Sequence, residues 1–216
     1  MPAERLLDRY GLPPAEIERL SLRRLEEVAG DALPEDPGAR RLALRVLYAA
    51  GDPQLASALR IHPCAVSAGL QALRGGAPVV VDVGMVAAGL RLARTGYPVI
   101  VAIEQPEAAE LAAKAGITRA AAGTRLLLPR LGGCVVVIGN APTALLALLD
   151  GIDAGAAPPG LIIGMPVGMV AAAESKAELL ARDVPYLTLL GTRGGSPLAA
   201  AALNALAELA APTHAG

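Results

Sequence analysis

The chain has 216 residues, which predicts one sizeable core and a single domain. Its 19 basic and 20 acidic residues give a net charge of -1, and it lacks Trp and Phe, so neither charge nor base-stacking side chains favour nucleic-acid binding. Gly, Pro or a charge interrupts each apolar run before the roughly 18 residues that a membrane-spanning helix needs. Cys64 and Cys134 lack metal or redox spacing, so we expect buried free thiols and a soluble cytoplasmic protein without a targeting signal.

The first third of the chain is predicted to be helical. Helical patterns cover residues 14–28, 38–50 and 64–73, and the turn-rich stretches GDALPEDPG and GDPQ separate them. An open sheet does not require these helices. We therefore interpret a helical segment of about 14–74 as an appendage to a core of about 78–210 within one domain, 1–216.

Five short apolar runs predict the strands of that core. They are VVVDV (79–83), VIVAI (99–103), CVVVIG (134–139), LIIGM (161–165) and YLTLL (186–190). Continuous apolar character is typical of strands that are covered on both faces, and helical segments at 107–115, 141–149, 170–182 and 197–209 alternate with them. The pattern predicts a three-layer α/β/α sandwich with a five-stranded parallel sheet in flavodoxin-like order.

The loops after these strands bring glycine to the strand ends and then begin a helix. They read GMVAAGL, GNAPTALLALL, GMPVGMVAAAESK and GTRGGSPLAAAALNALA. Ligands of open parallel sheets bind at the carboxyl ends of strands, where glycine allows close approach and helix N-termini attract anions. The simpler alternative is that glycine and proline only turn the chain. Neither a dinucleotide-binding nor a P-loop glycine motif is present, so a nucleotide site lacks support.

Three cations near these loops suit an anionic ligand. Arg119, Lys176 and Arg193 each stand close to a predicted strand end or helix start, and a guanidinium there fits a carboxylate or a phosphate. Each one alone is more often a solvated or capping charge. Together they favour a site for an anion.

Other candidates carry weaker signals. Asn140 and Thr143 also fit helix capping, whereas Asp82 lies inside an apolar run and must find a partner if it is buried. Met85 is compatible with core packing. His62 and His214 have neither zinc-site nor catalytic-triad spacing, so the sequence favours neither metal binding nor covalent catalysis.

Five motifs occur in an order that resembles the precorrin-8X methylmutases, or precorrin isomerases, of cobalamin biosynthesis. The motifs are DVGMVAAGL, GITRAAAGTRLL, GNAPTALLALL, GMPVGMVAAAESKAEL and VPYLTLLGTRGGSPLAAAALNALA, and the likeness runs over about 14–206. The resemblance implies a flavodoxin-like fold and a homodimer with active sites at the subunit interface.

The resemblance also implies an activity, a 1,5-sigmatropic shift of a methyl group from ring carbon 11 to ring carbon 12 of a tetrapyrrole, without an added cofactor. The product would be hydrogenobyrinate or, from a cobalt complex, cobyrinate; the sequence leaves open whether the substrate is precorrin-8X or cobalt-precorrin-8. The carboxylate fringe of such a macrocycle would explain the anion-seeking loops.

The family's catalytic histidine lies in a segment of the form R-x-x-H-A-x-G, which here reads RVLYAAGD. Arg45 matches the substrate-contacting arginine, and Tyr48 stands in place of the histidine. Their i, i+3 spacing puts both on one helical face. A phenol, with an ordinary pKa of about 10, is a weaker acid than imidazolium but still a hydrogen-bond donor, so Tyr48 is predicted to be the catalytic donor.

Ser21 matches a second family contact in the N-terminal helix. The remaining predicted substrate contacts are Asp82, Met85, Thr118, Arg119, Asn140, Lys176 and Arg193. Two alternatives remain: a weak or silent tetrapyrrole-binding relative in which Tyr48 only packs, and a flavodoxin-like nucleotide binder. If the Tyr48 hydroxyl is not the donor, His62 is the next candidate.

Overall fold

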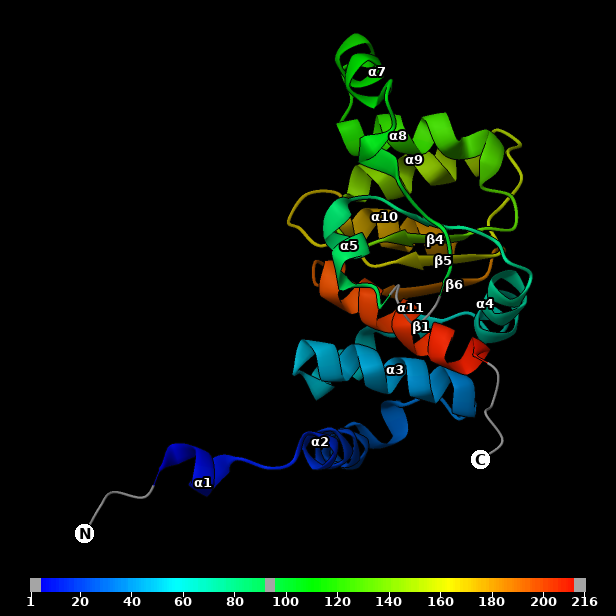
Figure 1. Cartoon of the computed structure of the whole chain (residues 1–216). Coiled ribbons are helices and arrows are strands. Elements are labelled where there is room, and N and C mark those ends of the chain that lie inside the picture. Colours follow the sequence, from blue (N-terminus) through cyan, green and yellow to red (C-terminus); the bar gives the residue numbers. More distant parts are fainter. Residues whose placement is uncertain (1–4, 92–95, 212–216) are drawn as a thin grey trace.

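A computed structural model describes residues 5–91 and 96–211 of the chain. Its centre is one six-stranded sheet with the spatial order β1-β6-β5-β4-β2-β3 (Figure 1). The strands are β1 (Leu59–Ile61), β2 (Val79–Val81), β3 (Val99–Val101), β4 (Val135–Ile138), β5 (Leu161–Gly164) and β6 (Tyr186–Leu189).

The five predicted strands form the parallel part of this sheet. Numbered along the chain, they follow the order 2-1-3-4-5 from β3 to β6, which confirms the flavodoxin-like arrangement. Val80 of β2 pairs with Val136 of β4, and Val136 pairs with Ile162 of β5. Because all five run in one direction, their carboxyl ends lie at one edge of the sheet, which we call the tip edge.

The prediction of five strands was wrong by one. Strand β1 pairs antiparallel with β6, with Leu59 opposite Leu189 and Ile61 opposite Leu187. The sequence LRI is too short to show a strand period. The N-terminal segment is therefore more than an appendage, because it supplies one edge of the sheet.

Ten helices surround the sheet in the described part of the chain. They are α1 (Leu6–Tyr10), α2 (Pro14–Ala29), α3 (Pro37–Ala50), α4 (Ala65–Arg74), α5 (Gly84–Gly89), α7 (Ala108–Ala115), α8 (Arg119–Leu127), α9 (Pro142–Asp153), α10 (Ala172–Leu180) and α11 (Ser196–Ala210). Short 3₁₀ turns are η1 (Gly30–Ala32), η2 (Pro53–Ala58), η3 (Ala102–Glu104) and η4 (Leu128–Arg130).

The predicted helices are present with small shifts at their ends, and α1 and α8 are additions. Helix α8 begins after Thr118, whose Oγ1 accepts a hydrogen bond from the Ala121 N–H at 3.2 Å. Helix α10 begins two residues after the predicted start at 170. The cause is Ala171, whose φ of 61° lies in the left-handed region and cannot continue a helix from Val170.

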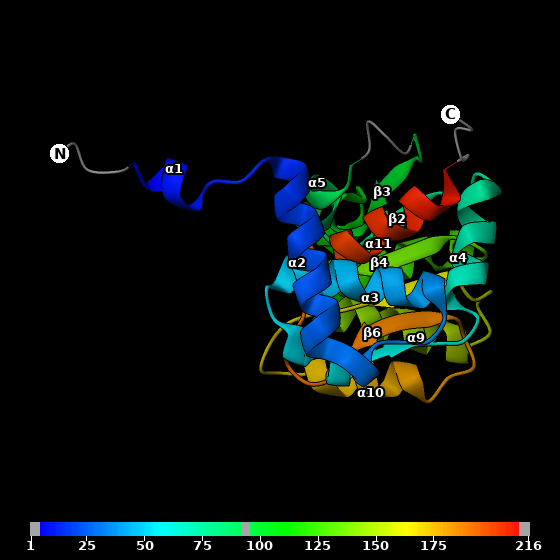
Figure 2. The same ribbon diagram turned by 90° about the horizontal axis from the view of Figure 1, so that it is seen from below.

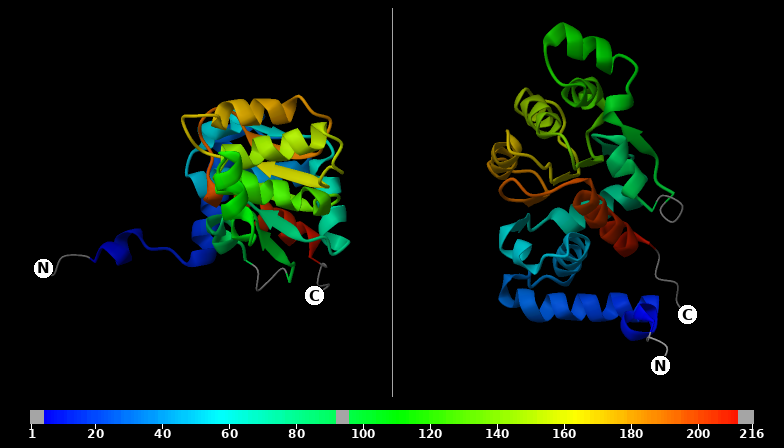
Figure 3. Two further views of the ribbon diagram at one scale, coloured as in Figure 1. Left: turned by 90° about the horizontal axis from the view of Figure 1, so that it is seen from above. Right: turned by 90° about the vertical axis from the view of Figure 1, so that its left-hand side faces the viewer.

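Alternate strand residues pack into two apolar layers. Val79, Val81 and their counterparts in β4, β5 and β6 face α3, α4 and α11. Val80 and its counterparts face α8, α9 and α10. Figure 3 (right) shows the helices on both sides of the sheet, so the predicted three-layer α/β/α core is confirmed.

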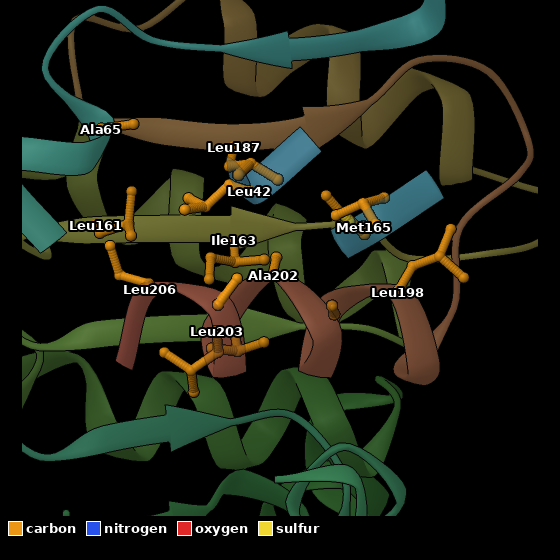
Figure 4. Close-up of a cluster of buried hydrophobic side chains, with 14 of the residues drawn as sticks. Leu42, Ala65, Leu161, Ile163, Met165, Leu187, Leu198, Ala202, Leu203 and Leu206 are labelled. Atoms are coloured by element: carbon orange, nitrogen blue, oxygen red, sulfur yellow. The ribbon is translucent and has the colours of Figure 1, made fainter. Parts of the chain in front are cut away.

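Helix α11 forms the centre of the larger layer. Its Leu203 and Leu206 lie beside Leu161 and Ile163 of β5, and Leu42 of α3 joins the same cluster (Figure 4). Fully burying one such side chain contributes about 1.5–3 kcal/mol relative to exposure. Helix α3 packs on α11 and α2 packs on α3, so two further helices are stacked outside the sandwich on this side (Figure 1).

The beginning of the described chain leaves the body of the molecule. Residues 5–13, which contain α1 and which we call the N-terminal arm, project beyond the tip edge, at which α5 and α11 begin (Figures 1 and 2). No residue of α1 is buried.

Candidate active site

Three predicted residues lie together where α2 packs on α3. Tyr48 and Ser21 line a cavity of about 310 Å³, and Tyr48 and Arg45 line a second one of about 240 Å³. As their spacing predicts, Arg45 and Tyr48 therefore meet one space. Tyr48 is 40% exposed, so its ring does not belong to the core. This placement leaves the phenol accessible to a ligand.

Arg45 is held between two carboxylates. Its Nη1 lies 2.7 Å from Glu18 Oε1, and its Nη2 lies 3.5 Å from Glu208 Oε2. Glu208 also pairs with Arg41 at 3.1 Å and with Arg91 at 3.2 Å. A substrate carboxylate that approaches Arg45 must therefore displace or share these acidic partners.

Helix α11 supplies wall residues that sequence reasoning missed. Asn204 and Glu208 both line the 240 Å³ cavity. Asn204 Oδ1 accepts from the Arg91 N–H at 3.0 Å, and its Nδ2 donates to the Gly89 carbonyl at 3.0 Å. A usable signal existed, because these two polar residues stand four apart on one face of an otherwise Ala- and Leu-rich helix.

Ser21 has a local hydrogen bond in this structure. Its hydroxyl donates to the Ile17 carbonyl at 2.6 Å, one turn earlier in α2. Its side chain nevertheless lines the cavity with Tyr48. A substrate contact by Ser21 would require the hydroxyl to exchange this partner, and the contact stays a prediction.

Asp82 finds the partner that its sequence position requires. It is 1% exposed, and its carboxylate accepts hydrogen bonds from the N–H groups of Gly139, Asn140 and Ala141 at 3.1, 2.8 and 2.8 Å. Burial raises the pKa of Asp82, while these N–H donors act in the opposite direction. Asp82 thus anchors the loop between β4 and α9 and fixes the position of Asn140.

The exposed side chains at this edge include Met85. It is 64% exposed in α5, so the core-packing alternative is wrong. Asn140, two residues after the end of β4, is also exposed. Both stand at the tip edge, as predicted, although their contact with a substrate stays a prediction.

Lys176 joins two tip-edge loops from inside. It is fully buried, and its Nζ donates to the Pro166 carbonyl at 3.0 Å and to the Arg193 carbonyl at 2.7 Å. Burial lowers the pKa of Lys176 to about 8. In this conformation the ammonium donates its hydrogen bonds to the loop carbonyls, and direct contact of Lys176 with a substrate stays a prediction.

The loop between β6 and α11 approaches the backbone after β5 closely. A Cβ at Gly194 would lie 2.4 Å from the Met165 carbonyl oxygen, and φ at Gly194 is +159°. The Gly195 N–H donates to the same carbonyl at 2.8 Å. Next to them, Ser196 Oγ is buried without a hydrogen-bond partner among the described residues. Sequence reasoning did not single out Ser196, although it stands in the glycine-rich loop.

Arg193 connects the tip edge to the Tyr48 region. Its Nη1 lies 2.7 Å from Asp52 Oδ2, and Asp52 follows the end of α3. Arg193 is thus paired while its side chain remains 55% exposed. None of the predicted tip-edge residues lines either of the two cavities beside Tyr48. The Arg193–Asp52 ion pair therefore links two groups of predicted residues that are otherwise separate.

Thr118 and Arg119 lie at the start of α8. The hydroxyls of Thr118 and Thr143 are 2.6 Å apart, and both residues line a cavity of about 300 Å³. Thr118 is the N-cap of α8, while Arg119 is exposed. Since Thr143 is in the first turn of α9, directly after β4, these residues border the tip edge.

Two other candidates lie elsewhere. His62 Nδ1 accepts from the Cys64 N–H at 3.1 Å, and its ring packs edge-on against the ring of Tyr186. His62 lines a cavity that is separate from those of Tyr48. His214 lies outside the described residues. Cys64 and Cys134 are free thiols, as predicted, but only Cys134 is buried; the prediction of burial was wrong for Cys64, which is exposed.

Residues 5–91 and 96–211 contain neither a cluster of metal-binding side chains nor a membrane-spanning helix. No group of three or more His, Cys, Asp or Glu side chains there is placed to hold a metal ion. No helix in that part is both long and apolar enough to cross a bilayer.

Known proteins are similar to this chain in both sequence and fold. The profile of the precorrin-8X methylmutase family (CbiC) matches residues 16–209. A precorrin-8X methylmutase of Pseudomonas aeruginosa is 45% identical over 171 residues, covering 77% of this chain and 82% of its own length. A cobalt-precorrin-8 methylmutase of Priestia megaterium is 41% identical over 169 residues, covering 77% and 75%.

A solved structure agrees with these sequence matches. The precorrin-8X methylmutase of Thermus thermophilus superposes with a TM-score of 0.79 at 38% identity, covering 90% of this chain and 96% of its own. With the match over residues 16–209, the arrangement of Arg45 and Tyr48 and this shared fold, the chain belongs to the precorrin-8X methylmutase family, a family of isomerases.

Proposed function

We propose that this chain moves a methyl group from ring carbon 11 to ring carbon 12 of a precorrin-8X-type tetrapyrrole. The observation that carries the proposal is the placement of Tyr48, which is accessible and lines one cavity with Arg45. Relatives bear the names of both the metal-free and the cobalt-containing activity. Both substrates therefore belong in the test.

Tyr48 is assigned the donor role. Its hydroxyl would hydrogen-bond or protonate the macrocycle while the methyl group migrates. General acid assistance typically contributes about 10²- to 10⁴-fold to a rate, and a phenol supplies part of that as a hydrogen-bond donor. The methyl shift does not require Tyr48 or any other protein group to form a covalent bond with the substrate.

Arg45 is assigned to a substrate carboxylate. Its guanidinium, with a side chain that is 18% exposed, is already oriented by Glu18 and Glu208. Exchange of one acidic partner for a substrate carboxylate would keep Arg45 paired. Ser21 is assigned a second contact on the same side, where it shares a cavity with Tyr48.

The tip edge is assigned to the other carboxylates of the macrocycle. Helices α9 and α11 begin there, and the N–H groups at a helix N-terminus favour anions. Asn140 and Arg193 precede these two helices, and Thr118 and Arg119 stand at the start of α8. Ser196 Oγ adds a donor without a partner among the described residues. Asp82 and Lys176 would act by holding the loops, and Met85 would supply apolar contact.

A homodimer with the site at the subunit interface completes the proposal. The cavities beside Tyr48 measure about 240 and 310 Å³. Pockets that enclose drug-sized ligands span about 300–1,000 Å³, and a tetrapyrrole belongs at the upper end. A second subunit would supply the missing wall. The cytoplasmic location remains a prediction from composition.

The test is direct conversion of the substrate. Purified protein is incubated with precorrin-8X and, separately, with cobalt-precorrin-8, and the visible spectrum of the rearranged corrin is followed. We expect Tyr48→Phe to slow turnover about 10²-fold or more with little change in substrate affinity. The matched control is Tyr186→Phe, which removes a hydroxyl from a half-buried ring on β6.

The replacement of histidine by tyrosine favours one alternative, a tetrapyrrole-binding protein without turnover. Tight binding of either substrate by the unmodified protein without spectral conversion would establish that alternative. Conversion at the same rate by Tyr48→Phe would instead keep the activity and remove the phenol from the mechanism. Tyr48→His provides a third comparison, since restoration of the family's residue should give at least the original rate.

A further inference from the structure

The N-terminal arm exposes large apolar side chains without any support from the body. Leu6, Leu7 and Tyr10 are 72%, 78% and 69% exposed, and α1 contains no buried residue. Within the arm, the Arg9 guanidinium lies 5.2 Å from the Tyr10 ring centroid. A helix of five residues is not stable alone in water, because the free-energy cost of nucleating the helix exceeds the stabilisation from its few hydrogen bonds. The arm therefore needs a surface to lie on.

The direction of the arm decides where that surface is. In all three views that show the chain from the side, above and below, the arm extends outward past the edge at which the strands end (Figures 1, 2 and 3). It cannot lie on its own body in this direction. Another molecule that faces the tip edge would meet both the edge and the arm.

The tip edge carries a second exposed apolar set. Met169, Val170 and Met85 are 87%, 83% and 64% exposed. The first two belong to the loop that joins β5 to α10, which Lys176 fastens at the Pro166 carbonyl. Met169 and Val170 are neighbours in the chain, and a group of exposed apolar residues on a folded body marks an interaction surface more often than a single one does.

The charges of the two sets are complementary. Arg5 and Arg9 flank the apolar residues of the arm. Glu104 lies beside the start of α5, since its Oε1 is 3.4 Å from the position of a Cβ at Gly84, the residue before Met85. Glu174 follows Val170 in the first turn of α10. Both glutamates are exposed. The tip edge also carries the cations Arg119 and Arg193, so the complementarity is local: Glu174 lies next to the apolar residues of the loop, and Glu104 lies next to α5.

We propose that the N-terminal arm of one copy lies on the tip edge of a second copy, and that a two-fold axis makes the exchange reciprocal. Each chain has both an arm and a tip edge, so in a two-fold dimer each arm lies on the partner's tip edge and neither surface remains unpaired. The proposal rests on the homodimer of the proposed function and specifies its surfaces. It also makes α1 of one copy a wall of the other copy's tip-edge site.

The test uses two full-length variants that are each defective in one half. The arm variant carries Leu6→Ser, Leu7→Ser and Tyr10→Ser, and the edge variant carries Met169→Ser and Val170→Ser. Because these side chains are exposed in the single chain, both variants should fold normally, which circular dichroism and urea unfolding verify. Sedimentation equilibrium should show the dimer of each variant weakened about 10- to 100-fold. The control with Leu6→Met, Leu7→Met and Tyr10→Phe should dimerise like the parent chain.

Mixing the two variants identifies the pairing. Homodimers of either variant have no intact arm–edge contact, whereas the mixed dimer has one, in which the intact arm lies on the intact edge. Native mass spectrometry of an equal mixture should therefore show a larger share of mixed dimer than random pairing of the two variants gives. A statistical or smaller share of mixed dimer would overturn the pairing, as would a parent chain that stays monomeric or an arm variant that dimerises normally. Conversion of substrate is measured separately, so loss of activity with intact arm-dependent dimers would count only against the proposed function.

Discussion

Arg193 Nη1 lies 2.7 Å from Asp52 Oδ2, and this pair ties the loop after β6 to the end of the helix that carries Tyr48. The side chains are 55% and 32% exposed, so the pair contributes only about 0–1 kcal/mol to stability. Its importance is positional, because it joins the two groups of candidate site residues.

Arg193→Ala should therefore affect turnover more than folding. We expect kcat/KM to fall about tenfold while the free energy of unfolding changes by less than about 1 kcal/mol. Steady-state kinetics and urea unfolding measure the two quantities. Asp52→Asn, which keeps an acceptor for the Gln54 N–H, is the matched variant and should lower kcat/KM in the same direction. Equal kinetics for both variants and the parent chain would remove the positional role.

Arg45→Ala should weaken substrate binding. The guanidinium supplies a charge-assisted contact to a carboxylate, so we expect KM to rise about tenfold and kcat to change less than about threefold. Glu18→Gln is the control, because it removes one partner of Arg45 but leaves Glu208 in place. A normal KM for Arg45→Ala would show that substrate carboxylates bind elsewhere.

Lys176 should give the native state a specific pH dependence. Its folded pKa of about 8 lies below the ordinary 10.5, so between these values the unfolded chain binds more protons than the folded chain. The penalty for the buried charge is complete below about pH 8 and is relieved as the pH rises toward 10.5. The parent chain should thus gain stability relative to Lys176→Met between pH 8 and 10.5, as measured by urea unfolding. Parallel pH profiles for the two proteins would contradict this assignment.

Asp82→Asn should destabilise the fold. An amide oxygen cannot replace both carboxylate oxygens that accept from three N–H groups, and its NH₂ would face donors. We expect a loss of about 2–3 kcal/mol in the free energy of unfolding. Asp150→Asn, at an exposed position in α9, should change it by less than about 0.5 kcal/mol. A loss of activity without a loss of stability would instead point to a direct catalytic role for Asp82.

Gly194→Ala should displace the loop before α11. A Cβ there would lie 2.4 Å from the Met165 carbonyl oxygen, in contact with rigid backbone. We expect lower stability together with weaker substrate binding, observed by thermal unfolding and by KM. Gly76→Ala is the control, since Gly76 also has a positive φ, +76°, but nothing lies within 4 Å of an added Cβ. That variant should show only the backbone cost of about 1–2 kcal/mol.

The sequence predicted the parallel sheet because its strands are buried on both faces. Runs such as 134–139 are apolar throughout, which distinguishes them from half-exposed strands. It did not predict β1, since three residues with Arg60 in the middle show no period. Nor did it predict the late start of α10, because only the structure reveals the left-handed backbone of Ala171.

The candidate site was predictable by residue type but not by partner. The buried carboxylate of Asp82 had to be satisfied, yet its donors come from a loop 57 to 59 residues away. Likewise, Arg45 meets Glu208 across 163 residues of chain, and Lys176 is buried only because two loops close over it. Local patterns carry no information about such long-range contacts, which tertiary packing creates.

Strand β1 has a consequence for any attempt to shorten the protein. Its antiparallel pairing covers the edge of β6 from Leu187 to Leu189. A fragment that begins after α4 would keep all five parallel strands but would leave that hydrogen-bonding edge bare, and bare edges recruit strands from other molecules. This fragment would also lack Arg45 and Tyr48, and, expressed alone, it should form aggregates rather than a smaller working enzyme.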